Sequence, residues 1–88
     1  MSAHAPNLLA GSSESLAFET KRTLSQQIKL IMASSSISQA ELARRMSTSR
    51  AVVRRLLDEG DLSVTLLTIS KAACALDCTL MFGLEFNR

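Results

Sequence analysis

The stretch ISQAELARRMSTSRAVVRRLL, residues 37–57, predicts two short helices separated by a tight turn. Ser38 is a good N-cap, and Glu41 three positions later completes the Ser-x-x-Glu capping box. Either Thr48 or Ser49 can cap the second helix. The apolar residues recur at helical spacing and predict one buried face on each helix: Leu42, Ala43, Met46, Val52, Val53, Leu56 and Leu57.

Arginines occupy the other side of the second predicted helix. Arg50 and Arg54 lie one turn apart, with Arg55 beside them. A helix of about eight residues is unstable alone, so the two helices must exist as a packed pair. A capped helix, a short turn and a second helix with exposed arginines describe a helix-turn-helix. In that motif the second helix enters the major groove of DNA, where its N-terminal side chains reach base edges.

The same stretch resembles the lambda-repressor-like (XRE/Cro) DNA-binding domains. Their pattern is roughly Ser/Thr-Gln-x-x-Leu-Ala, a turn, then Ser-x-x-x-(Val/Ile)-x-x-(Ile/Leu). The residues in register are Ser38, Gln39, Glu41, Leu42, Ala43, Ser49, Val53 and Leu56, and the family's fourth helix is matched by Thr68, Ile69, Ala72, Ala73, Ala75 and Leu76. The resemblance covers residues from about 24 to 77 and implies an all-α domain of four to five helices.

Two positions depart from the family pattern. Ser47 stands in the turn where the family often has Gly, and a serine visits the left-handed region only at a cost. Leu57 stands where the family often carries Glu, which leaves an apolar side chain that needs burial, with a partner protein as one candidate.

The predicted DNA-binding residues follow from position and chemistry. Arg50 is the leading base reader, because its forked donors match guanine O6 and N7. Ser49 and Ala51 lie beside it, and the Ala51 methyl can contact a thymine methyl. Arg54 or Arg55 extends the reading or binds phosphate.

Further phosphate contacts are predicted on the preceding helices. Gln39 resembles the family's glutamine that touches phosphate and buttresses the first reading residue. Arg44 and Arg45 are candidates because their helix crosses the backbone. Three cations flank the first helix and are equally consistent with phosphate contact and with simple solvent exposure: Lys21, Arg22 and Lys29.

Composition and charge agree with this prediction. The chain has 88 residues and a net charge of +2, which indicates one small domain. Residues 38–57 hold five arginines against one glutamate, a local charge of +4, whereas residues 58–61 contribute −3. Such a basic patch is typical of a surface that faces phosphates. A chain of this size has a marginal core, and dimerisation is a common remedy.

The remaining segments complete the predicted organisation. Residues 1–15 form a flexible tail, residues 16–78 the DNA-binding domain, and residues 79–88 a C-terminal β-strand. The first helix runs from Thr23 to about Ala33, and residues 16–18 form a short strand or a staple before it. After a turn at residues 58–61, Ser63 or Thr65 caps the fourth helix, whose predicted inward residues are Leu66, Ile69, Ala72, Ala73 and Leu76.

The C-terminal strand is predicted from strict alternation of Leu80, Phe82, Leu84 and Phe86. A single strand must pair with another, either with residues 16–19 or with the same strand of a second copy. Pairing between copies is favoured, because a two-fold dimer suits a palindromic operator. A fifth helix is the competing interpretation, weakened by Gly83.

The sequence contains no catalytic constellation, no metal-ligand set and no cofactor motif, so the chain is predicted not to be an enzyme. It has no membrane-spanning run and no secretory signal, which predicts a cytoplasmic protein. The predicted function is a sequence-specific repressor that binds double-stranded DNA as a homodimer. One alternative is an antitoxin that also binds a toxin protein; another is a helical module that binds only protein.

Overall fold

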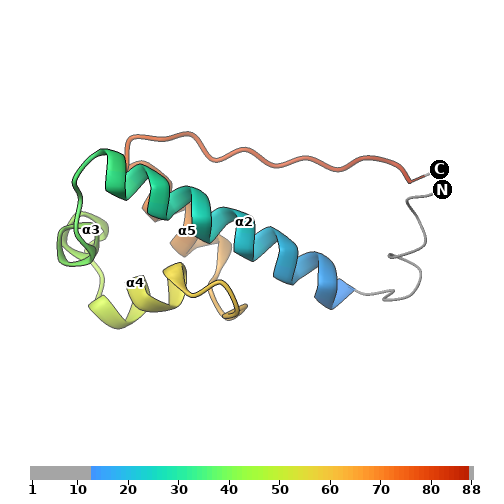
Figure 1. Ribbon diagram of the computed structural model, residues 1–88, viewed down its shortest axis with the longest axis horizontal. Coiled ribbons are helices and arrows are strands. Elements are labelled where there is room, and N and C mark those ends of the chain that lie inside the picture. The colour runs from blue at the N-terminus through green and yellow to red at the C-terminus, as the bar shows by residue number, and fades with distance from the viewer. Residues whose placement is uncertain (1–12, 88) are drawn as a thin grey trace.

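The computed structural model describes residues 13–87, which form four helices and no strand (Figure 1). These are α2 (Ser13–Ser34), α3 (Gln39–Met46), α4 (Arg50–Leu57) and α5 (Leu66–Ala75). Helices α3 and α4 pack together, α2 packs on α4, and α5 packs on α3. This all-helical arrangement fits a helix-turn-helix fold. Residues 1–12 of the predicted tail lie outside the described residues, and residues 13–15 belong to α2.

Helix α2 is twice as long as predicted. It begins at Ser13, so residues 16–18 form neither a strand nor a staple, and Thr23 lies inside the helix rather than at its cap. The buried face is formed by Lys21, Ser25, Ile28 and Met32. The only one of these residues before the predicted start at Thr23 is the polar Lys21, so an apolar pattern could not reveal the first half of the helix.

The predicted C-terminal β-strand is wrong. Residues 79–87 have no regular structure and run as an extended segment beside α2 toward its N-terminal end (Figure 1). Within this chain, residues 16–19 were the candidate partner, but they are helical. Their backbone groups therefore belong to the hydrogen bonds of α2 and cannot pair with a strand. Leu80 is half-buried, whereas Phe82 and the residues after it are exposed.

The hydrophobic core lies where all four helices meet. Its buried residues are Ile28, Met32, Leu42, Ala43, Met46, Val53, Leu56, Leu57, Ala72 and Leu76. Leu57 is only 7% exposed, so this chain buries it without a partner. Leu66 was predicted to face inward but is 59% exposed at the first position of α5, whereas Ala72, two turns later, is buried.

Three helices end on a left-handed residue that is not glycine. Ser36, Ser47 and Asp77 have φ values of 56°, 54° and 59° and follow α2, α3 and α5. In each case the next residue donates a backbone hydrogen bond five residues back, as Thr48 does to the Ala43 carbonyl at 2.9 Å. This is the Schellman arrangement, which glycine usually completes. Ser47 therefore adopts the left-handed backbone conformation that was predicted to be unfavourable for a serine.

Candidate nucleic-acid interface

The start of each helix in the helix-turn-helix is fixed by a serine cap. Ser38 Oγ accepts a hydrogen bond from the Glu41 N–H at 3.0 Å, and Ser49 Oγ accepts one from the Val52 N–H at 3.2 Å. Ser49 rather than Thr48 is thus the cap of α4. Arg50 becomes the first residue of α4, where side chains project beyond the helix end.

The exposed face of α4 carries three arginines. Arg50, Arg54 and Arg55 are exposed and Ala51 is half-buried beside them. On the opposite side of the helix, Val53, Leu56 and Leu57 are buried. Between residues 13 and 87, no carboxylate forms an ion pair with these three guanidinium groups. The structure therefore brings together the predicted reading residues on one accessible helical face.

The two arginines of α3 are held by Glu41. Arg44 Nε and Arg45 Nε donate to the Glu41 carboxylate at 3.0 and 2.8 Å. These hydrogen bonds lower the pKa of Glu41 to about 2. Arg45 Nη1 also donates to the Ala75 carbonyl at 3.3 Å and so joins α3 to the end of α5. Part of the positive charge that was predicted to face DNA is thus neutralised by Glu41 within α3.

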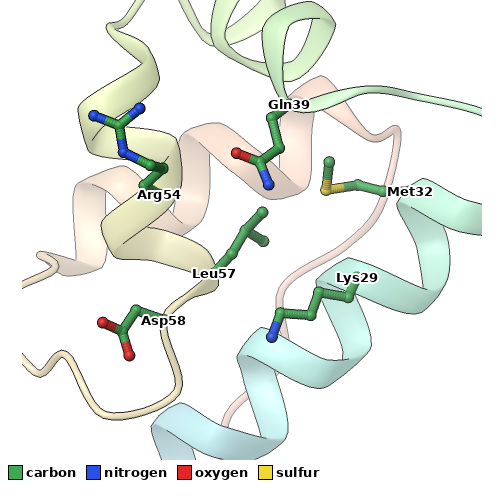
Figure 2. A pocket seen from close by; sticks show the side chains of 6 residues that line it. All are labelled: Lys29, Met32, Gln39, Arg54, Leu57 and Asp58. Carbon is green, nitrogen blue, oxygen red and sulfur yellow. The ribbon is translucent and has the colours of Figure 1, made fainter.

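Gln39 borders an open hollow of about 500 Å³ between α2, α3 and α4 (Figure 2). The side chains that line it are Lys29, Met32, Gln39, Arg54, Leu57 and Asp58. Gln39 and Lys29 extend toward this space from α3 and α2 (Figure 2). Lys29 Nζ also lies 3.6 Å from a carboxylate oxygen of Glu59. The hollow offers donors from two helices beside the arginine face of α4.

The acidic loop after α4 uses its carboxylates locally. Asp58 Oδ1 accepts the Gly60 N–H at 3.0 Å, and Asp61 Oδ1 accepts both the N–H and the hydroxyl of Ser63. The hydrogen bonds from Ser63 lower the pKa of Asp61. These bonds shape the turn that separates α4 from α5.

Sequence reasoning missed two buried polar residues on α2. Lys21 Nζ donates to the carbonyls of Arg55 and Asp58 at 3.0 and 2.5 Å, and Ser25 Oγ donates to the Leu56 carbonyl at 2.9 Å. Desolvation by burial lowers the pKa of Lys21. The usable signal was their spacing of seven and three residues ahead of Ile28, which places them on the apolar side of α2.

Two further properties come from the described part of the chain. In residues 13–87, no group of His, Cys, Asp and Glu side chains is arranged to hold a metal ion. None of the helices there combines the length and the apolarity that crossing a membrane requires. Cys74 and Cys78 are free thiols.

Comparison with known proteins gives one match. A sequence model of the Cro/C1-type helix-turn-helix DNA-binding domain matches residues 27–81, which include α3, α4, α5 and the last third of α2. No curated protein and no solved structure matches the chain significantly. The family match spans more than half of the sequence and contains the capped helix pair with its exposed arginines. The chain therefore belongs to the Cro/C1-type helix-turn-helix DNA-binding domains.

Proposed function

We propose that this protein is a transcriptional repressor that binds a palindromic operator as a homodimer. The observation that carries the proposal is the exposed face of α4, where Arg50, Arg54 and Arg55 face solvent without a carboxylate partner among the described residues. Guanidinium groups on the second helix of a helix-turn-helix are suited to base edges and phosphates in a major groove.

Arg50 is the proposed base reader. It lies in the first turn of α4, and its two parallel donors match O6 and N7 of guanine. Ala51 follows it with a methyl group of the size that packs against thymine. Ser49 uses its oxygen as an acceptor in the cap, which leaves its hydroxyl proton available to donate to DNA. Arg54 and Arg55 extend the reading or bind phosphate.

The hollow between α2, α3 and α4 supports a phosphate contact. Gln39 and Lys29 supply donors at its edge, and Arg54 lies on the same rim. Arg44 and Arg45 join this set as phosphate contacts when a DNA strand competes with Glu41 for their donors. Contacts of this kind fix the orientation of the protein on the duplex without reading its sequence.

The exposed apolar residues support dimerisation with a second copy. Leu84 is fully exposed, Phe86 is 92% exposed, and Leu16 and Phe18 on the first turns of α2 are about half exposed. A shallow, mainly apolar groove lies nearby between α2 and Phe82. A second copy is the occupant that a palindrome requires, because it places two reading helices about 34 Å apart. Leu80, Phe82, Leu84 and Phe86 are then dimer contacts through their side chains.

A second candidate function is that of an antitoxin, in which the exposed segment at residues 82–87 binds a toxin protein. The observation that favours it is the same apolar exposure, which is high for a small monomer. The two candidates differ in solution. A repressor dimer sediments as a dimer on its own, whereas an antitoxin whose apolar segment awaits a toxin sediments as a monomer.

Selection of bound sequences from a random duplex pool tests the proposed function. An enriched inverted repeat supports a two-fold dimer that reads DNA, and the spacing of its half-sites gives the separation of the two α4 helices. Enrichment of a single half-site contradicts the dimer. Binding that falls with salt but enriches no sequence contradicts the repressor.

A further inference from the structure

We propose that Lys21 and Ser25 are positioning residues for DNA reading, because they hold the C-terminal end of α4 at a fixed angle. The inference rests on the proposed function, since it concerns how α4 presents Arg50 to a base. Neither Lys21 nor Ser25 is proposed to contact DNA itself.

The contacts converge on the last turn of α4. Lys21 Nζ donates to the carbonyls of Arg55 and Asp58, and Ser25 Oγ donates to the carbonyl of Leu56. The last four carbonyls of a helix have no partner within it, and the helix dipole places partial negative charge there. The Lys21 ammonium therefore lies at the partial negative charge of this helix end, and the Ser25 hydroxyl supplies a donor to one of its carbonyls.

Burial makes these contacts specific. Lys21 is 6% exposed and Ser25 is fully buried, so water does not compete for the same carbonyls. Removing the Ser25 hydroxyl takes the donor from the buried Leu56 carbonyl. Removing the Lys21 ammonium leaves the Arg55 and Asp58 carbonyls with only their backbone donors, the N–H groups of Asp58 and Asp61. The structure can recover that loss only by moving the end of α4 toward solvent or toward another donor.

Such a movement reaches the reading residue because α4 is short. A helix of eight residues is about 12 Å long and behaves as a rigid rod. Its N-terminal end is fixed by the Ser49 cap and its C-terminal end by α2. A tilt at the C-terminal end changes the direction of Arg50 at the other end, and paired hydrogen bonds to guanine weaken steeply with angle.

Lys21 is poorly placed to contact phosphate directly. Its ammonium is already within 3.0 Å of two carbonyl oxygens, and burial by α2 and α4 leaves it little access to a ligand. Burial is the main reason that its pKa is lowered, while the negative charges of Asp61, Asp58 and Glu59 act in the opposite direction and favour its charged form. Its charge is thus balanced within the protein.

The test compares affinities for the selected duplex and for a scrambled duplex at several salt concentrations. The variants are Lys21→Met, Lys21→Arg and Ser25→Ala, and Lys71→Met on the exposed side of α5 is the control that removes the same charge. All are assayed at a temperature at which melting curves show them folded. We expect Lys21→Met to lose about tenfold in preference for the selected duplex, and Ser25→Ala about threefold, with the salt slope unchanged.

Lys21→Arg keeps a long cationic donor, and we expect it to retain more of the preference than Lys21→Met. Equal losses on both duplexes with a shallower salt slope would instead show a phosphate contact and overturn the inference. So would an unchanged preference in Ser25→Ala and Lys21→Met together with a lower melting temperature, since that result shows support of the fold alone. A wild-type protein without any preference overturns the proposed function itself, which is a separate result.

Discussion

Arg45 Nε lies 2.8 Å from a carboxylate oxygen of Glu41, one turn earlier on the same helix. Arg44 donates to the same carboxylate, so one acidic side chain holds both arginines of α3. The arginines of α4 have no such restraint among the described residues. Within the helix-turn-helix, the arginines without an ion-pair partner are therefore those of α4, the proposed reading helix.

Replacing Glu41 with Gln should raise the affinity for DNA of any sequence. The change removes one negative charge and releases Arg44 and Arg45 to bind phosphates. Each additional phosphate contact steepens the slope of log K against log salt by about 0.9, so we expect a steeper slope by about 1 to 2. Fluorescence anisotropy with a mixed-sequence duplex measures this. Glu14→Gln, at the far end of α2, makes the same charge change and should leave the slope nearly unchanged.

The same glutamate gives a pH dependence of stability. Its pKa is lowered in the folded protein to about 2, from an ordinary value of 4.5. A lowered folded-state pKa contributes stability above the unfolded pKa, and that contribution disappears as the pH falls through the folded value. Wild type should therefore exceed Glu41→Gln in free energy of unfolding at pH 7. The difference should shrink from about pH 4.5 down to about pH 2, as denaturant unfolding measures. A difference that is constant across this range refutes the role of the carboxylate.

Ser47→Gly should stabilise the domain. Ser47 has φ 54° and ψ 47° at the end of α3, a conformation that costs glycine little and serine more. We expect a gain of about 0.5–1 kcal/mol, which raises the melting temperature of a domain of this size by about 2–8 °C. Ser47→Ala is the control, because it removes the hydroxyl but keeps Cβ. If both variants behave alike, the backbone conformation is not the cause.

Charges on the exposed C-terminal segment should separate the dimer. Leu84→Asp with Phe86→Asp places two carboxylates where a second copy is proposed to pack. Both side chains are almost fully exposed, so the melting temperature of the monomer should not change. Analytical ultracentrifugation should show a dimer for wild type and a monomer for the double variant. Leu30→Asp, on an exposed part of α2, should stay dimeric. A dimeric double variant locates the interface elsewhere.

Much of the recognition surface could be predicted from the sequence because the relevant signals are local. Serine and threonine at helix starts, and apolar residues at helical spacing, predicted α3, α4 and the cap Ser38. They left two candidates for each later cap, of which the structure selects Ser49 and Thr65. The first half of α2 escaped because its one buried residue is Lys21, and an apolar pattern cannot register a polar residue whose partners are distant carbonyls.

The prediction of a C-terminal strand was wrong for a related reason. Alternation of Leu80, Phe82, Leu84 and Phe86 describes side chains, whereas a strand exists only when a neighbouring backbone is free to pair. The predicted partner within the chain belongs to α2, and no local property of residues 79–87 reveals that. The left-handed residues Ser36 and Asp77 were similarly hidden, because sequence rules assign that conformation to glycine, whereas the family pattern pointed to it at Ser47.

The most direct test of the account is the affinity of Arg50→Ala for the selected duplex and for a scrambled duplex of the same length. Lys71→Ala on the exposed side of α5 serves as the control for charge. A base-reading role predicts that Arg50→Ala loses about 1–3 kcal/mol on the selected duplex, loses much less on the scrambled one, and relaxes the preference at one base pair of each half-site. Equal losses on both duplexes would make Arg50 a phosphate contact and contradict the claim that the first turn of α4 reads the operator.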